Sequence, residues 1–245
     1  MRHRQRRPFF EGPNPPSLVR RAFGEGVATA GLTMAVVFSV QATWLGALRP
    51  LAICLGVPAA LVALTLSFGP VTGAHFNPLV TASQWLRGHR DTRCLIAYIC
   101  AQFVGALIGA SLAALLVSPA PHVAPAPIRV VIGGEVFASA GLITIVLAAC
   151  LVTGPLTGLS AVVGWLVMVN LAAPGGPLAN PVLALSISFT MGSVNASLLV
   201  AHVAAEIAGA ALALLIIALT YPGTGARAPA KNGQLNVAET SPELM

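Results

Sequence analysis

Long apolar stretches without charged residues dominate the pattern of this chain. No Asp, Glu, Lys or Arg occurs between Arg49 and Arg87, and only Glu206 interrupts the stretch from Glu135 to Arg227. A helix crosses the hydrocarbon core of a bilayer with about 20 apolar residues, so both stretches can hold spanning helices. The period-two alternation of barrel strands is not seen. The pattern predicts six spans: Arg21–Leu45, Pro50–Phe68, Arg93–Val117, Val130–Leu151, Leu156–Ala172 and Leu198–Tyr221.

The composition indicates the same environment. Hydrophobic residues make up 56% of the 245 residues and charged residues only 8%, whereas about a quarter of an average soluble domain is charged. The mean hydropathy is +0.85. Because so few charges cannot cover a surface in contact with water, we expect an all-α integral membrane protein.

The apolar stretches define one membrane domain, residues 18–221, between two tails. Residues 1–17 and 222–245 are rich in Pro, Gly and polar residues, which predicts disorder. The cysteines predict no disulfides, because all of them fall in predicted spans, where Cys acts as a small apolar residue: Cys54, Cys94, Cys100 and Cys150.

The basic residues predict the orientation in the membrane. With a cytoplasmic N-terminus, eleven of the thirteen Lys and Arg residues lie on the cytoplasmic side, and only Arg49 and Arg129 lie outside. Cytoplasmic loops carry the excess of basic residues, so we expect both termini in the cytoplasm. We interpret the basic N-terminal segment as this orientation signal, next to anionic lipid, and expect no binding to nucleic acid.

The second half of the membrane domain repeats the first. Three dipeptides recur in the same order, at offsets of 110, 103 and 104 residues: Gly24-Glu25 as Gly134-Glu135, Asn77-Pro78 as Asn180-Pro181, and Ala101-Gln102 as Ala205-Glu206. This predicts two three-span units, about 18–117 and 128–221. Because three is odd, the second unit is inverted relative to the first, and such repeats share a site near the bilayer midplane.

Each unit contains an Asn-Pro dipeptide followed by a helix too short to cross the bilayer, over Leu79–Leu86 and Val182–Thr190. Asn favours the N-cap of a helix and Pro its first turn, so each half-helix is expected to begin at its Asn-Pro, inside the membrane. The positive ends of both helix dipoles then lie at the midplane beside the carboxamides of Asn77 and Asn180. Water in a pore would hydrogen-bond to the backbone carbonyl groups of the non-helical loops that precede the two half-helices. Such a pore would pass neutral solutes and repel cations and protons.

These motifs resemble those of the aquaporin, or major intrinsic protein, family. The resemblance rests on the string GAHFNPLVT at Gly73–Thr81, on Asn180-Pro181-Val182, and on the Glu25/Glu135 and Gln102/Glu206 pairs. It implies a right-handed bundle of six transmembrane helices with two re-entrant half-helices, assembled as a homotetramer. It also implies pore-midplane residues and pore-lining loop residues, respectively Asn77, Pro78, Asn180 and Pro181, and Gly73, Ala74, His75 and Gly176.

A carboxylate inside a membrane span is costly, so such a residue is first considered as a functional residue. The resemblance favours a scaffolding role for Glu25 and Glu135, in which each accepts hydrogen bonds from the backbone of the neighbouring re-entrant loop. A proton relay is the alternative. His75 is either a residue of the pore vestibule or a packed side chain. Glu206 departs from its repeat partner Gln102; it is expected to hold a helix contact or to pair with His202 one turn earlier.

The resemblance also implies four selectivity-filter positions, which fall here on Val57, Met168, Pro177 and Leu183. Family members place Arg three residues after the second Asn, where this chain has Leu183. Few donors remain at such a mouth, so selectivity for water alone is not expected. Leu79 and Val182 add bulk next to the Asn pair. Residues Gly69–Gly73 resemble a bacterial subgroup associated with metalloids and small uncharged solutes, which implies a bacterial inner membrane.

The leading hypothesis is a passive channel for water and small neutral solutes, such as glycerol, ammonia or undissociated metalloid acids including arsenite, that excludes protons and ions. We expect no catalysis, cofactor or metal ion. The competing hypothesis is a proton-coupled secondary transporter that uses Glu25, Glu135 and Glu206. A third is a structural protein with a closed pore, since Leu79, Val182 and Leu183 are bulky.

Overall fold

The computed structural model describes residues 10–12, 14–117, 126–152, 154–173, 175–190 and 196–221, and every regular element among them is helical. The elements are α1 (Leu18–Gln41), α2 (Arg49–Leu51), α3 (Val57–Thr72), α4 (Pro78–Leu86), α5 (Thr92–Leu116), α6 (Ile128–Val152), α7 (Pro155–Ala172), α8 (Pro181–Thr190) and α9 (Ala196–Thr220). The predicted tail at 222–245 and residues 1–9 of the other tail lie outside the described residues.

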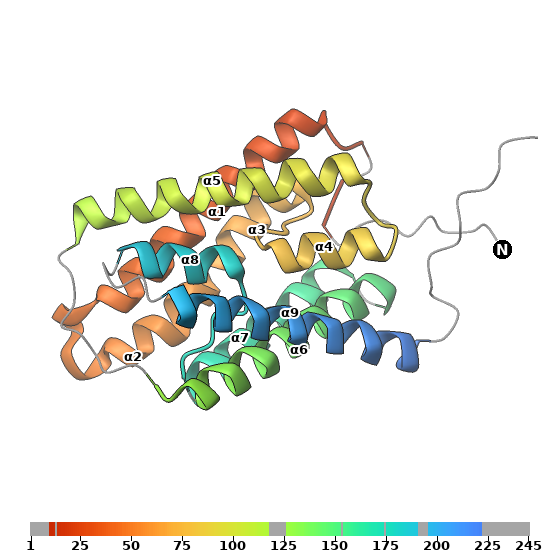
Figure 1. Cartoon of the computed structure of the whole chain (residues 1–245). Coiled ribbons are helices and arrows are strands. Elements are labelled where there is room, and N and C mark those ends of the chain that lie inside the picture. The colour runs from red at the N-terminus through yellow and green to blue at the C-terminus, as the bar shows by residue number, and fades with distance from the viewer. Residues whose placement is uncertain are drawn as a thin grey trace, which may run out of the picture.

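Within the described residues, six helical stretches are long and apolar enough to cross a membrane, which confirms the all-α class and the six predicted spans. The second stretch, Leu45–Thr72, is longer and less regular than predicted. A 3-10 turn over Thr43–Leu48 overlaps its start, and the stretch continues through α2 and a π-helical turn over Ala52–Gly56 into α3. Figure 1 shows the short helices α4 and α8 lying between the long ones.

Glycines bring the long helices of each half into backbone contact. A Cβ added to Gly105 of α5 would lie 2.1 Å from the carbonyl oxygen of Gly26 in α1. In the second half, a Cβ on Gly209 of α9 would lie 2.6 Å from the carbonyl oxygen of Val136 in α6. Figure 1 shows α1 running beside α5. The equivalent glycines of the two repeats therefore make equivalent helix crossings.

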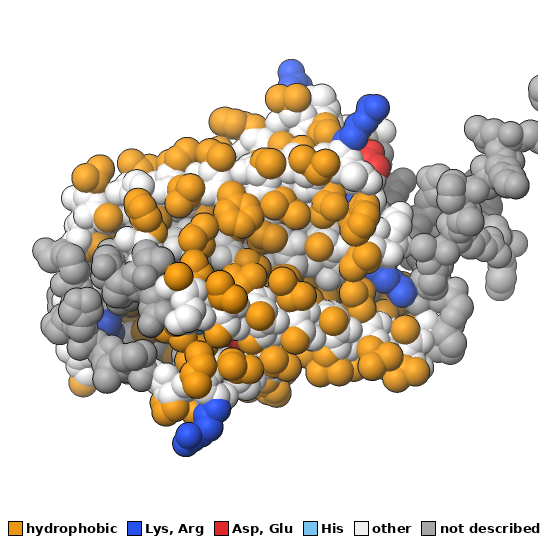
Figure 2. Space-filling model, viewed as in Figure 1, with side chains coloured by type: hydrophobic (Ala, Val, Ile, Leu, Met, Phe, Trp, Pro, Cys, Tyr) orange, Lys and Arg blue, Asp and Glu red, His pale blue; other side chains and the backbone are white. Residues whose placement is uncertain are grey.

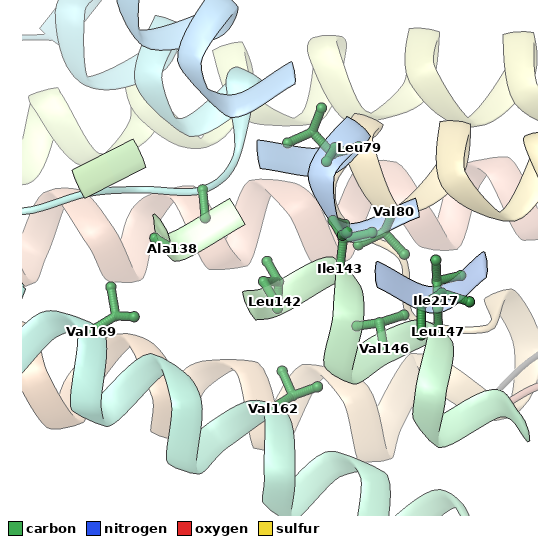
Figure 3. Packing of buried hydrophobic residues seen from close by; sticks show 13 residues of the cluster. Leu79, Val80, Ala138, Leu142, Ile143, Val146, Leu147, Val162, Val169 and Ile217 are labelled. Carbon is green, nitrogen blue, oxygen red and sulfur yellow. The ribbon is translucent and has the colours of Figure 1, made fainter. Parts of the chain in front are cut away.

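The apolar residues form a packed interior and an apolar flank. Leu79 and Val80 of α4 belong to the same buried cluster as Ile143 of α6 and Ile217 of α9 (Figure 3). Hydrophobic side chains cover most of the flank seen in Figure 2, and the Lys and Arg side chains lie mainly towards the ends of the long helices. An integral, multi-pass membrane protein has this distribution, because lipid covers its flank.

The end of the N-terminal tail differs from the expected disorder. Glu11 forms ion pairs with Arg21 of α1 at 3.0 Å and with Arg90, in the loop before α5, at 2.7 Å. The backbone N–H of Gly12 donates to the carbonyl oxygen of Pro70 at 2.9 Å. Because the Glu11 carboxylate neutralises two partly or fully buried guanidinium groups, this segment is held against the bundle.

Candidate functional site

Each half-helix begins at its Asn-Pro dipeptide. The Oδ1 atom of Asn77 accepts a hydrogen bond from the backbone N–H of Leu79 at 2.9 Å, two residues into α4. The Oδ1 atom of Asn180 accepts from Val182 at 3.3 Å, in the same position of α8. Pro is the first residue of both helices, where its missing N–H costs no hydrogen bond. Both Asn side chains therefore cap helices that start inside the bundle.

The two Asn carboxamides also join the repeats. Nδ2 of Asn77 donates to the carbonyl oxygen of Ala179 at 2.7 Å, and Nδ2 of Asn180 donates to that of Phe76 at 2.9 Å. Phe76 and Ala179 directly precede the Asn residues, and their φ angles are +48° and +51°. L-residues seldom adopt this left-handed conformation. The reciprocal bonds use one N–H of each carboxamide, and an amide carries two.

Glu25 anchors the loop before α4. The side chain is fully buried, and its carboxylate accepts hydrogen bonds from the backbone N–H groups of His75 at 3.0 Å and Phe76 at 2.8 Å. Nε2 of Gln102 donates to the same carboxylate at 2.9 Å and to the Thr81 hydroxyl at 3.0 Å. A buried carboxylate is tolerated when it is hydrogen-bonded in this way.

Glu135 holds the equivalent loop before α8. Its carboxylate accepts from the backbone N–H of Leu178 at 3.0 Å and of Ala179 at 2.9 Å. Nδ1 of His202 lies 2.9 Å from the same carboxylate, so His202 contacts Glu135. Glu206 instead accepts from the backbone N–H of Asn180 at 2.8 Å through one oxygen. Its other oxygen, Oε2, has no hydrogen-bond partner among the described residues.

His75 is both packed and adjacent to the channel. Its Nδ1 lies 3.1 Å from the Thr81 hydroxyl, and its ring packs edge-on against Tyr98 at 5.2 Å between centroids. His75 is 5% exposed and lines the cavity that also includes Asn77 and Asn180. The two alternatives left open by the sequence are therefore compatible.

A cavity of about 530 Å³ runs between the two repeats and includes both Asn residues. Its lining reaches from Phe10, next to Gly69 of α3, to Arg49 at the opposite end of the same span. It contains most of the predicted filter and loop residues, namely Val57, Pro177, Leu183, Gly73, Ala74, His75 and Gly176. Pro78, Pro181, Leu79 and Val182 are not part of this lining.

Met168, predicted in the filter, is not part of this cavity lining. It borders a separate, smaller pocket with Gly134 and Phe137 of α6. Leu166 and Asn170 of α7 line the channel instead. An α-helix turns 100° per residue, so a shift of two residues moves a side chain to the far side of the helix.

Sequence reasoning missed four polar residues in the cavity lining, Arg49, Thr65, Gln84 and Asn170. Arg49 could have been found by extending the four-residue helical spacing back along the chain from the predicted residue Val57. Residues four apart share one face of a helix, and the lining on this side is Arg49, Ile53, Val57, Leu61 and Thr65. The irregular start of the second span hid this periodicity, because Arg49 lies outside the predicted helix.

The site and the fold match known membrane channels. The major intrinsic protein family matches residues 15–156 of this chain. Aquaglyceroporin AqpS of Rhizobium meliloti (strain 1021) is 34% identical over 211 residues, which cover 82% of this chain and 89% of that one. A shorter match, 44% identical over 57 residues, covers 23% of this chain and 27% of an aquaporin-like protein of Haemophilus influenzae.

A solved structure shows the same fold. The aquaglyceroporin from Plasmodium falciparum superposes with a TM-score of 0.68 at 20% identity, covering 85% of this chain and 99% of that one. With the sequence matches, the assignment is plain: this chain belongs to the major intrinsic protein family. It is a passive channel for water and small solutes, and not an enzyme.

Proposed function

We propose that this channel conducts small neutral solutes, including glycerol, ammonia and undissociated metalloid acids such as arsenite, together with water, and that it excludes protons and ions. The supporting observation is the pair of reciprocal hydrogen bonds between Asn77 and Ala179 and between Asn180 and Phe76. These bonds hold two helix N-termini and two carboxamides at one level of the cavity. The positive potential there disfavours cations, and the second N–H of each carboxamide is a donor for solute oxygen.

The aliphatic filter supports the proposal that the channel conducts solutes larger than water. Val57 and Leu183 line the cavity where a charged or aromatic side chain would narrow it. AqpS, a relative that matches most of the chain, is named an aquaglyceroporin. Such a filter admits solutes by size more than by hydrogen bonding, and so it favours a broad range of small neutral molecules.

The carboxylate geometry favours a channel over a proton-coupled transporter. A coupling carboxylate has to meet the solute or its pathway. Glu25, Glu135 and Glu206 all accept hydrogen bonds from the loop backbone, and none is part of the described cavity lining. A scaffolding role for these residues accounts for every one of those bonds.

Stopped-flow light scattering on proteoliposomes tests the function. We expect permeability to water, glycerol and arsenite above that of empty vesicles, with no proton flux reported by a trapped pH dye and no effect of a protonophore. Permeability equal to empty vesicles for every neutral solute would refute the proposal, and solute flux that collapses with a protonophore would favour the transporter.

We propose further that the protein is a homotetramer in a bacterial inner membrane with both termini in the cytoplasm. The family resemblance supports the tetramer, and the distribution of Lys and Arg supports the orientation. Light scattering of the detergent-solubilised protein measures the oligomer. Labelling of single cysteines introduced near either terminus, in intact and opened cells, measures the orientation.

A further inference from the structure

Arg49 is the one charged residue among those that line the described cavity. It lies at the start of α2, and its side chain is partly exposed. In the orientation proposed above, this end of the cavity is the extracellular mouth. The walls next to Arg49 are mainly apolar, since Val40, Ile53 and Pro50 line the same end. A solute that loses its hydration water there meets few other hydrogen-bond donors.

The guanidinium group of Arg49 is held in place by α1. Its Nε donates to the carbonyl oxygen of Val40 at 2.9 Å, and its Nη2 donates to the same oxygen. Val40 belongs to the last turn of α1, where backbone carbonyls have no partner within the helix. Arg49 therefore caps α1, which fixes the position of its planar group at the wall of the cavity.

Capping leaves most of the donor capacity of Arg49 unused. Of the five N–H donors of a guanidinium group, two point to Val40, so three remain for other partners. A guanidinium group has no acceptor atom, so these groups can only donate. They suit acceptor oxygens, such as those of hydroxyl or carbonyl groups on a small neutral solute.

We propose that Arg49 is a specificity-determining residue of the channel, which binds the oxygen atoms of small neutral solutes at the outer mouth. The inference rests on the proposed conduction of such solutes. A solute with several acceptor oxygens has more hydration to replace than a water molecule does. Arg49 therefore favours polyols, urea and boric or arsenous acid relative to water, and its loss penalises them because the mouth then offers too few donors.

The test is the ratio of solute to water permeability in proteoliposomes, for glycerol, urea and boric acid. Arg49→Met keeps a similar length and removes the donors, and we expect the ratio for the best-conducted solute to fall at least fivefold. Arg129→Met is the matched control, since Arg129 is exposed and is not part of the cavity lining. It should leave the ratio unchanged.

The outcomes separate the inference from the proposed function. A wild-type protein that passes neither water nor solute refutes both. A wild-type protein that passes water alone refutes the proposed solute conduction, and the inference with it. Solute conduction by the wild type together with an Arg49→Met ratio that is unchanged or increased overturns the role of Arg49 only. If Arg49→Met does not fold, Arg49→Lys carries the test. It keeps the charge without the planar donor group, and we expect its ratio to fall at least twofold; an unchanged ratio would overturn the inference.

Discussion

Leu183 occupies the wall of the cavity three residues after Asn180, at the position that the family resemblance assigns to the filter arginine. It is 5% exposed and packs with Phe76, Leu32 and Val36. An aliphatic side chain here fills space and donates no hydrogen bond. Leu183 therefore makes the cavity wall apolar at this position.

We expect Leu183→Arg to lower glycerol permeability at least fivefold while water permeability falls less. The longer, charged side chain narrows the cavity and holds water in place. The measurement is stopped-flow permeability at equal amounts of folded, reconstituted protein. Leu183→Met, which keeps the size and apolar character, serves as the control. Equal permeability of the arginine variant and wild type to every solute would show that Leu183 lies outside the conduction path.

At the scale of the elements, the crossing of α1 and α5 depends on the absence of side chains. Gly105 meets the Gly26 carbonyl oxygen, and Gly109 meets that of Ala30, with no room for a Cβ at either position. Both obstacles are backbone atoms, so no rotamer change can relieve them. The two helices would have to separate by more than one ångström.

Gly105→Ala is expected to lower the free energy of unfolding by about 1–3 kcal/mol, because overpacking forces the two backbones apart. Thermal unfolding in detergent measures the change. The control is Gly164→Ala in α7, where a Cβ meets no atom within 4 Å. That variant should be stabilised, by up to about 1 kcal/mol, because alanine favours the helix. Equal behaviour of the two variants would contradict the close crossing.

The N-terminal segment is an element whose attachment depends on one charge. The side chains of Glu11 and Arg90 are only 6% and 5% exposed, so each depends on the other for neutralisation. Arg90 also donates to the Thr72 carbonyl oxygen at 3.3 Å and lies over the Tyr98 ring. Through Glu11, the segment connects α1 with the loop before α5.

We expect Glu11→Gln to lower the free energy of unfolding by about 2 kcal/mol, because it leaves a buried guanidinium group without a counter-charge. Protease cleavage near Glu11 should also become faster. Thermal unfolding and timed proteolysis measure both effects. Arg20→Gln removes an exposed charge nearby and should change neither. Equally slow proteolysis of Glu11→Gln and wild type would show that the ion pairs do not hold the segment.

For the molecule as a whole, equivalent residues of the two inverted repeats can be compared directly. Glu25 and Glu135 hold equivalent loops, and Phe76 and Ala179 share an unusual backbone conformation. The symmetry fails at Gln102 and Glu206. Gln102 donates to Glu25, whereas Glu206 accepts from the backbone N–H of Asn180; each keeps one side-chain oxygen without a partner among the described residues.

We expect Glu206→Gln to leave glycerol permeability within twofold of wild type, because a glutamine oxygen can still accept from Asn180 and its amide can donate to Glu135, as Gln102 does to Glu25. Glu135→Gln is the contrasting variant. An NH2 group, which donates, replaces one of the carboxylate oxygens that accept hydrogen bonds from backbone N–H groups. The substitution should lower both permeability and thermal stability. A folded Glu206→Gln protein without solute flux would contradict the scaffolding role and favour proton coupling.

The helices were predictable because they depend on local chemistry. Apolar length, the Asn-Pro caps and the position of charges placed α4, beginning at Pro78, and α8, beginning at Pro181, within one residue of their observed starts. The side chains facing the channel were harder to predict. Met168, predicted in the filter, borders a separate pocket because its face depends on how α7 packs, and Arg49 was missed because the second span begins irregularly.

The membrane class, the six spans, the duplication and the two helix starts were predictable from the residue pattern alone. Each follows from hydropathy, from capping or from similarity between residues of the same chain. The packing of the helices, in contrast, sets which residues share the cavity, brings the Asn carboxamides into reciprocal hydrogen bonds across the repeats, and pairs Glu11 with Arg90. Those contacts join residues about 80 to 100 positions apart, and side-chain direction at that range depends on the packing of whole helices.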